Sequence, residues 1–282
     1  MKVLVLGASG QLAAAVVHEF GPHADVVAYG RGDLDITDDV RVAARVAAEA
    51  PDVIVNCAAY NLVDEAEDDP VAALNVNAMA VRALARAAVA ADATLIHVST
   101  DFVFDGRANE PYLESDSPNP QSVYAWSKLL GEWFAADAGK HYVFRVESLF
   151  GRAPGGPTRG SASTILQRIR AGEEARVFVD RTVSPTLVTD AAAAMRAAMA
   201  GGLPYGVYHC VNSGHCTWWE FAEEAARLMG RDARLVPITL ADVSMRAARP
   251  KYSALANAKL ASLGVAVPDW RDALRRVVEH PD

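Results

Sequence analysis

The first half of the chain alternates short apolar runs with longer alanine-rich stretches, and this alternation restricts the possible folds more than any other feature. The apolar runs lie at residues 2–6, 26–29, 53–56, 94–99 and 142–146. They lack the polar alternation of a half-exposed strand, which indicates strands covered on both faces. Helices are expected between them, at residues 11–20, 38–50, 70–91 and 122–136. This pattern predicts an α/β fold with a doubly wound parallel sheet.

The second half begins with a change of character. Residues 151–160 combine glycines and prolines with Arg152 and Arg159, which predicts a loop. Helices are then expected at residues 162–171 and 190–200 and after Thr217, and strands at 176–179 and 205–210. We expect a first domain at residues 1–146 and a smaller α/β lobe at 147–282, with residues of about 176–200 returning to the first domain.

Composition narrows the partners and the compartment. The chain has 27 lysines and arginines against 35 aspartates and glutamates, a net charge of −8 that does not favour nucleic acid. The first apolar run is too short for a signal peptide or a membrane span, so no membrane partner and a cytoplasmic location are expected. Three unpaired cysteines indicate no disulfide framework. The acidic run at 64–69 is interpreted as a solvated turn and not as a metal site.

A glycine turn directly follows the first expected strand, as Gly7-Ala8-Ser9-Gly10-Gln11-Leu12-Ala13. Gly7 permits the tight turn, Gly10 lets the backbone approach a pyrophosphate, and Ala13 allows close helix packing. After the second strand, Arg31 suits a ribose 2′-phosphate, so NADPH is preferred and NADH stays possible; the alternative is a solvated surface arginine. Asp35 is expected on the adenine side, unless it belongs to the first turn of the next helix.

The third expected strand ends in small residues, Asn56-Cys57-Ala58-Ala59-Tyr60. Small side chains at the carboxyl end of a parallel strand leave room for a ligand. Cys57 is interpreted as a small apolar spacer and not as a nucleophile, because no cationic neighbour is evident from the sequence. The expected cofactor-binding residues are Gly7, Ser9, Gly10, Gln11, Leu12, Arg31, Asp35, Ile36, Cys57, Ala58, Ala59, Tyr60 and Lys128.

Three residues with reductive chemistry follow in order. Thr100 ends the fourth expected strand, and Tyr124 and Lys128 lie four positions apart on the next helix, so they share a helix face. A cation beside a phenol lowers the pKa of the phenol from about 10 and prepares it for acid–base work on a carbonyl. Thr100 is expected to donate a hydrogen bond to the same carbonyl oxygen.

Together, five motifs resemble the extended short-chain dehydrogenase/reductase superfamily and, within it, the dTDP-4-dehydrorhamnose reductase family. They are the glycine turn, residues 99–106, residues 124–128, Ser184-Pro185-Thr186 and residues 249–253. The resemblance implies a Rossmann-type first domain that binds the dinucleotide, a substrate-binding second lobe, and hydride transfer to C4 of a nucleotide-linked 4-keto-6-deoxy sugar. It also implies that Tyr124 protonates the alkoxide, Lys128 tunes Tyr124 and binds ribose, and Thr100 orients the carbonyl.

The expected substrate is a nucleotide-diphosphate sugar. Asn61 and Val63 resemble positions that touch substrate in the family, although Asn61 alternatively caps the next turn, and Asp101 is expected beside them. Arg249 and Lys251 are expected to pair with the diphosphate, with ordinary surface charge as the alternative. Arg152 and Arg159 are further candidates for the same anion. Trp218, at the start of a helix, is interpreted as a packing residue.

Two departures from the family pattern limit the transfer. The family usually shows Arg-Thr-Ser-Trp where this chain has Arg145-Val146-Glu147-Ser148, so the sugar, its C4 stereochemistry and the pathway stay open. Some relatives dimerise through a metal bound partly by a glutamate of the first helix, which is absent from Ala13-Ala14-Ala15. No metal is therefore expected, and the chain is expected to be a monomer or homodimer.

Two other functions are compatible with these residues. One is a nucleotide-sugar epimerase or dehydratase that retains its cofactor and recycles the hydride. The other is a non-catalytic regulatory subunit that binds NADP and a partner enzyme, because a retained set of catalytic residues does not prove turnover.

Overall fold

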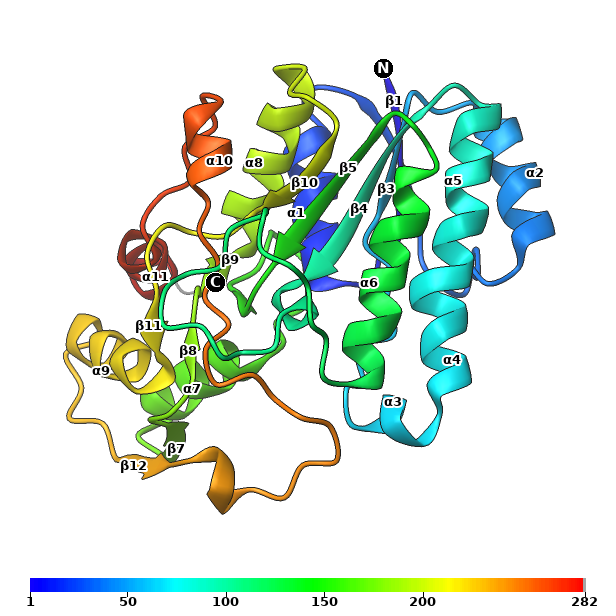
Figure 1. Ribbon diagram of the computed structural model, residues 1–282. Coiled ribbons are helices and arrows are strands. Elements are labelled where there is room, and N and C mark those ends of the chain that lie inside the picture. Colours follow the sequence, from blue (N-terminus) through cyan, green and yellow to red (C-terminus); the bar gives the residue numbers. More distant parts are fainter. Residues whose placement is uncertain (281–282) are drawn as a thin grey trace.

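The computed structural model describes residues 1–280 and is built around a six-stranded parallel sheet (Figure 1). Its strand order is β10-β5-β4-β3-β1-β2. The chain order therefore reverses between β1 and β3, where ligands bind in sheets of this kind. The predicted doubly wound α/β class is confirmed. The strands are β1 (Lys2–Leu6), β2 (Asp25–Tyr29), β3 (Val53–Asn56), β4 (Thr94–Thr100), β5 (His141–Val146) and β10 (Gly206–His209).

Both faces of the sheet are buried, which explains the uninterrupted apolar runs. Val3 and Val5 pack with residues of α1 (Gln11–Phe20) and α8 (Val188–Ala200). Leu4 and Leu6 point the other way, into a cluster with residues of α2 (Asp39–Glu49), α5 (Ala80–Ala90) and α6 (Val123–Ala136). Successive residues of each strand thus serve opposite layers of helices, as the period of two requires.

Side-chain caps start two of these helices. The Asp38 carboxylate accepts a hydrogen bond from the Arg41 amide at 3.0 Å at the start of α2. Ser122 Oγ accepts one from the Ala125 amide at 3.2 Å at the start of α6. These bonds satisfy amides that have no partner inside the helix.

The helix predicted at residues 70–91 is divided into three parts: α4 (Pro70–Leu74), the π-helical turn η1 (Asn75–Met79) and α5. Within η1, Asn77 accepts from the Tyr60 amide at 2.8 Å and donates to the Tyr60 carbonyl at 3.0 Å. It also donates to Ser127 Oγ at 2.9 Å. The π-helical turn therefore positions the Asn77 side-chain amide, which holds the segment after β3 in place. Hydrophobic periodicity does not predict such a turn.

The second lobe has its own core, formed around Phe150, Trp218, Phe221 and Trp270. β7 (Ala175–Phe178) pairs with β12 (Leu235–Ile238) outside the central sheet, whereas α8 packs on α1 and β10 joins β5. No helix of residues 1–280 is long and apolar enough to cross a membrane. The remaining elements are α3 (Glu65–Asp68), η2 (Asp101–Val103), β6 (Leu149–Phe150), α7 (Ser161–Ala171), β7 (Ala175–Phe178), β8 (Thr182–Val183), β9 (Thr186–Leu187), β11 (Cys216–Thr217), α9 (Trp218–Leu228), β12 (Leu235–Ile238), η3 (Leu240–Asp242), α10 (Ala258–Ser262) and α11 (Trp270–Glu279).

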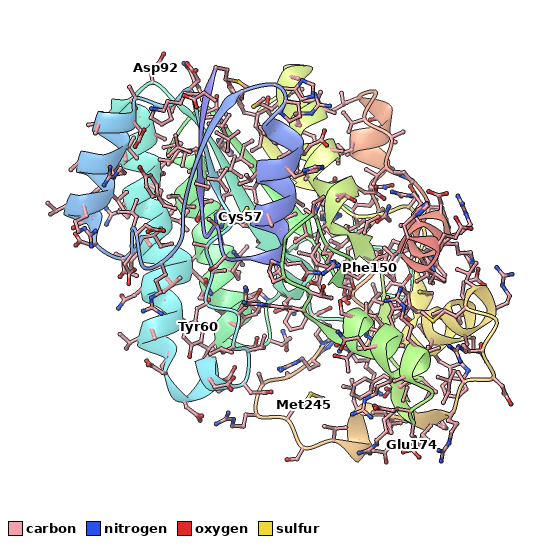
Figure 2. The ribbon with its side chains drawn as sticks, turned by 180° about the vertical axis from the view of Figure 1, so that it is seen from behind. Cys57, Tyr60, Asp92, Phe150, Glu174 and Met245 are labelled. Atoms are coloured by element: carbon pink, nitrogen blue, oxygen red, sulfur yellow. The ribbon has the colours of Figure 1, made fainter. Side chains whose placement is uncertain are left out.

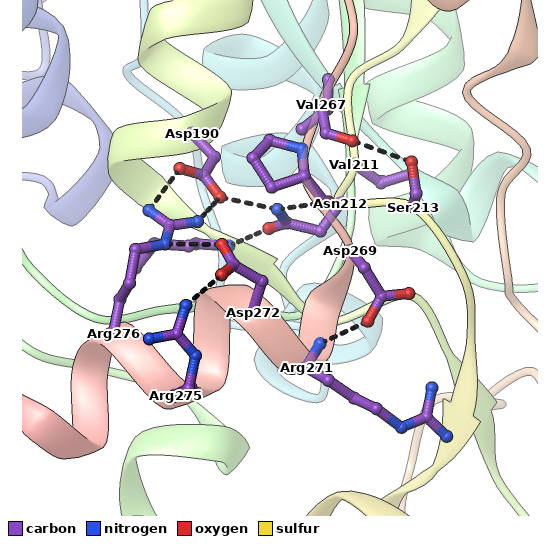
Figure 3. Close-up of polar contacts among 12 residues, drawn as sticks. Asp190, Val211, Asn212, Ser213, Val267, Asp269, Arg271, Asp272, Arg275 and Arg276 are labelled. Carbon is purple, nitrogen blue, oxygen red and sulfur yellow. Dashed lines mark hydrogen bonds and ion pairs between the residues drawn. The ribbon is translucent and has the colours of Figure 1, made fainter.

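A polar network joins the last helix to the first domain's helical layer (Figure 3). Arg276 of α11 binds both carboxylate oxygens of Asp190 of α8, at 2.9 and 2.6 Å. Asn212 donates to the same carboxylate at 2.6 Å and to the Pro268 carbonyl at 2.9 Å. Its side-chain oxygen accepts from the Leu187 amide at 2.7 Å. Segments far apart in the chain thereby share one partly buried ionic contact.

Candidate active site

Two adjoining cavities lie at the carboxyl edge of the central sheet, where it meets the second lobe. The larger has a volume of about 600 Å³ and the smaller about 230 Å³. Figure 2 shows Cys57, at the end of β3, and Phe150 near the middle of the molecule, where the two lobes meet. The residues common to both cavities are Gly10, Cys57, Ala59, Asn61 and Arg159.

All the predicted cofactor-binding residues line one or both of these cavities. Gln11, Leu12 and Lys128 line only the larger one, and Gly10, Cys57 and Ala59 line both. The predicted cofactor-binding residues that line only the smaller cavity are Gly7, Ser9, Arg31, Asp35, Ile36, Ala58 and Tyr60.

The glycine turn fits a dinucleotide. Gly7 has φ +82°, and a Cβ there would lie only 2.7 Å from the Ala58 amide nitrogen, so a side chain would collide with the crevice wall. Gly10 caps α1 without any side chain bonded to the free amides of the first turn. Those amides, at the positive end of the helix dipole, suit a pyrophosphate.

Arg31 and Asp35 lie together at the outer end of the smaller cavity. Their side chains form an ion pair with 3.3 Å between Arg31 Nε and an Asp35 oxygen, and the Arg31 side chain is 86% exposed. The Thr37 amide and hydroxyl hold the pKa of Asp35 below its usual value. Arg31 keeps N–H groups that suit a phosphate at this end.

Cys57 lines both cavities and carries a free thiol. Burial raises the pKa of this thiol to about 12, and the nearby Lys128 cation only partly opposes that shift. This cationic neighbour was not evident from the sequence, because Lys128 follows Cys57 by 71 positions and only the fold brings the two together. A thiol protonated at neutral pH is a poor nucleophile, in line with its interpretation as a spacer.

Thr100, Tyr124 and Lys128 all line the larger cavity. The Tyr124 hydroxyl lies 3.5 Å from Asn61 Oδ1. Burial raises the pKa of the Tyr124 phenol, although the Thr100 hydroxyl opposes the shift. The expected lowering of this pKa is therefore wrong for the protein without ligands, because desolvation outweighs the effect of any cation.

Lys128 is held by the end of β4. Its Nζ donates to the Val98 carbonyl at 2.6 Å. Burial lowers the pKa of Lys128 to about 8, opposed mainly by the charge of Glu132. Glu132 is itself buried in an ion pair with Arg145, at 2.8 and 2.7 Å. The lysine thus lies at the floor of the cavity with its charge compensated from the next turn of α6.

The substrate-side predictions divide into two groups. Asn61, Asp101 and Arg249 line the larger cavity, whereas Val63 and Lys251 do not. Val63 packs against the cluster that contains Tyr124. Lys251 has a 70% exposed side chain and lies 3.8 Å from the Asp180 carboxylate. The Lys251 side chain therefore lies outside the cavity lining and is not placed to pair with a diphosphate bound there.

Arg181, Glu147 and Trp218 also line this cavity, and the sequence analysis assigned none of them to the site. Glu147 was visible as a departure from the family pattern. Trp218 was interpreted as packing, and it does contribute to the core of the second lobe. Arg181 directly precedes the short strand β8 and carried no sequence signal. Only the approach of the two lobes brings these residues to Thr100.

A dinucleotide crevice that opens onto a threonine, a tyrosine and a lysine defines a nicotinamide-dependent reductase of the short-chain dehydrogenase/reductase type. Comparisons with known proteins narrow this class. The family model described as "RmlD substrate binding domain" matches residues 1–282, and the chain belongs to this family.

Three relatives illustrate the family. A dTDP-4-dehydrorhamnose reductase of Streptomyces griseus is 39% identical over 96% of this chain and 91% of its own length. A probable dTDP-4,6-dihydroxy-2-methyloxan-3-one 4-ketoreductase of Streptomyces antibioticus is 36% identical over 100% of this chain and 98% of its own. The crystal structure of a dTDP-4-dehydrorhamnose reductase of Bacillus anthracis in complex with NADP superposes with a TM-score of 0.92, at 32% identity and 99% coverage of both chains.

Proposed function

We propose that the protein uses NADPH to reduce the 4-keto group of a dTDP-linked 4-keto-6-deoxy sugar. The observation that carries the proposal is the convergence of Thr100, Tyr124 and Lys128 on one cavity beside the glycine turn. The names of the relatives support a reductase over an epimerase or dehydratase. NADPH is supported by the relative solved with NADP and by Arg31 at the outer end of the smaller cavity.

When bound, the reduced nicotinamide supplies the hydride. Tyr124 supplies the proton, because its raised pKa keeps the phenol protonated at neutral pH. The developing alkoxide at C4 is a stronger base than the phenolate, so proton transfer from Tyr124 is favourable. On substrate binding, the Thr100 hydroxyl turns from the Asp101 carboxylate to which it donates in the free protein, and donates to the carbonyl oxygen instead. There it stabilises the charge that develops.

Lys128 and Arg249 serve binding in this proposal. Lys128 is cationic below pH about 8 and holds the ribose side of the cofactor. Arg249 lines the substrate side, and its guanidinium suits the diphosphate. We assign dinucleotide binding to residues 1–146 and substrate binding mainly to residues 147–282. Residues of about 176–200 return in part to the first domain in this proposal, which the packing of α8 on α1 supports. We also propose a cytoplasmic monomer or homodimer without bound metal.

The test is NADPH oxidation with dTDP-4-keto-6-deoxyglucose or its 3,5-epimer as substrate. Tyr124→Phe should lower kcat by about 10²–10⁴-fold and leave NADPH binding unchanged. Tyr205→Phe is the matched control, since Tyr205 is exposed on the second half of the chain and should keep full activity. Bound NADPH without turnover of either sugar would contradict the proposal and favour the regulatory subunit.

A further inference from the structure

One wall of the larger cavity has no role in the proposed reaction. It is formed by Arg181, Trp218 and Glu147. We call these three residues the polar wall. The backbone fixes them together: the Trp218 amide donates to the Arg181 carbonyl at 3.2 Å, beside the antiparallel pairing of β8 with β11. Glu147 is held from the same side, because it accepts from the Ser184 amide at 2.7 Å and from the Ser253 hydroxyl. The wall is therefore built before any ligand arrives.

The donors of the polar wall are incompletely bonded. Arg181 is partly buried, and Nε donates a long 3.4 Å hydrogen bond to the Pro250 carbonyl. Within residues 1–280, no hydrogen bond or ion pair engages its two terminal nitrogens. Trp218 is only 4% exposed, and its indole nitrogen has no partner in the described chain. A buried donor without a partner, such as the Trp218 indole nitrogen, is costly, which points to a ligand that completes it.

The acceptors restrict the chemistry of that ligand. Glu147 is 1% exposed and lines the cavity together with Asp101, whose carboxylate accepts from the Thr100 hydroxyl at 2.9 Å. The Asp101 carboxylate, which lines the cavity with the Arg181 guanidinium, disfavours a phosphate, and the guanidinium disfavours an ammonium group. A hydroxyl group, which donates and accepts at once, satisfies both kinds of partner.

Resting on the proposed function, we propose that the polar wall binds the ring hydroxyl groups of the sugar. It thereby makes the enzyme select a 4-keto sugar with hydroxyls at C2 and C3 over its 2-deoxy analogue. The physical basis is that a site built to bind a hydroxyl leaves its own buried groups unpaired when the hydroxyl is missing. Discrimination of this kind is far stronger than that of an apolar pocket.

Trp218→Phe is the sharpest variant, because it removes one N–H and keeps an aromatic ring in the core. In the free protein that N–H has no partner, so the melting temperature should not fall through its loss. We expect kcat/KM for the hydroxylated sugar to drop about 5- to 10-fold, as for one lost hydrogen bond. Trp270→Phe is the matched control: its indole nitrogen is equally unpartnered, but Trp270 lies in the lobe core and does not line the cavity.

Arg181→Met should lower kcat/KM about 10- to 100-fold, as for hydrogen bonds to a charged group. For wild type, kcat/KM should be at least about 100-fold higher with the hydroxylated sugar than with the 2-deoxy analogue, and both variants should reduce this ratio. Neither should change the affinity for dTDP alone in the presence of NADPH, measured by calorimetry. If Arg181→Met lowers the affinity for dTDP as strongly as the affinity for the sugar nucleotide, Arg181 binds the diphosphate. That result would overturn the inference.

Equal kcat/KM for the two sugars in wild type would also overturn it, with the proposed reductase function intact. No NADPH oxidation with either sugar is a different failure, since it contradicts the proposed function and removes the inference with it. If Trp218→Phe lowers only the thermal stability and leaves the ratio of kcat/KM for the two sugars unchanged, Trp218 is a packing residue. That result would overturn its assignment to the sugar.

Discussion

Arg249 Nη2 donates a hydrogen bond to Asp64 Oδ2 at 2.9 Å, across 185 positions of the chain. Asp64 also accepts from the Ala247 amide at 2.9 Å, and these contacts hold the pKa of Asp64 below its usual range. From the same acidic run, Glu67 accepts from the Val123 amide at the start of α6. The interpretation of residues 64–69 as a solvated turn is therefore wrong in part, because this turn ties the substrate side to the first domain.

Among the described residues, no group of acidic, histidine or cysteine side chains could hold a metal ion.

This ion pair orients a residue that we assign to the diphosphate. Arg249→Ala should weaken dTDP binding by about 1.5–3 kcal/mol, as for a lost hydrogen bond to a charged group. Asp64→Asn keeps the guanidinium and should cost less than half of that. The control is Arg246→Ala, which breaks an exposed ion pair with Asp68 of the same run and lies outside the cavity lining. Titration calorimetry with dTDP measures all three, and an Arg246→Ala loss as large as that of Arg249→Ala would contradict the assignment.

The buried charge of Lys128 should lower the free energy of unfolding, although the reaction requires this residue. Burial lowers its pKa in the folded protein to about 8, against an ordinary value of 10.5. Between these values the unfolded chain binds more protons than the folded one, so the contribution of Lys128 to the free energy of unfolding rises with pH there. Lys128→Met should thus stabilise the protein by on the order of 3 kcal/mol at pH 7.

That gain should shrink as pH rises from 8 to about 10.5, where the lysine is neutral in both states. Urea unfolding at pH 7 and at pH 10 gives the comparison. NADPH oxidation by the same variant should fall by about 100-fold or more. A variant less stable than wild type at pH 7 would show that the bond to the Val98 carbonyl outweighs the burial of the charge.

The Asp101 and Glu147 carboxyl groups should bind protons more tightly in the folded protein than in the unfolded chain. Burial raises the pKa of Asp101 to about 6 and the pKa of Glu147 well above its usual value, and the two charges oppose each other. Arg181, Ser253 and the Ser184 amide only partly offset this. The folded chain therefore binds more protons above pH 4.5, and this pair's contribution to stability falls as pH rises through that range.

Glu147→Gln removes one of the two charges and should stabilise the protein more at pH 8 than at pH 5. We expect the gain to differ by about 1–2 kcal/mol between these pH values. Chemical denaturation of wild type and variant at both values measures this difference, which cancels the titration of all other groups. A gain independent of pH would mean that Glu147 is not protonated on folding.

The ion pair of Arg276 with Asp190 should contribute more to the free energy of unfolding than the other ion pairs of α11 (Figure 3). The Asp190 side chain is 9% exposed and satisfies Arg276 and Asn212 together. Asp190→Ala should lower the free energy of unfolding by about 2–3 kcal/mol, below the full cost of breaking a buried pair because Arg276 is 35% exposed. Arg275→Ala breaks an exposed pair with Asp272 on the same helix and should cost less than about 0.5 kcal/mol. Equal losses in urea unfolding would contradict a special role for Asp190.

The sequence predicted the site best where function depends on the backbone. The glycine turn, the end of β3 and the spacing of Tyr124 and Lys128 are local patterns, and the crevice residues drawn from them line the two cavities. Prediction was weaker for single side chains of the second lobe. Arg249 and Lys251 are two positions apart, yet only Arg249 lines the cavity. Neighbouring side chains of an irregular segment point in different directions, and no periodicity records which one faces inward.

By itself, the sequence determined the layered α/β architecture and the position of the dinucleotide crevice, because strand periodicity and glycine geometry are local properties of the chain. The tertiary structure decided which charges meet. Desolvation raised the pKa of Tyr124 where spacing alone predicted the opposite. The approach of the second lobe placed Arg181 and Trp218 beside Glu147, from segments separated by dozens of residues. Burial and long-range contact are sums over the whole fold, so they exist only once the two lobes have packed together.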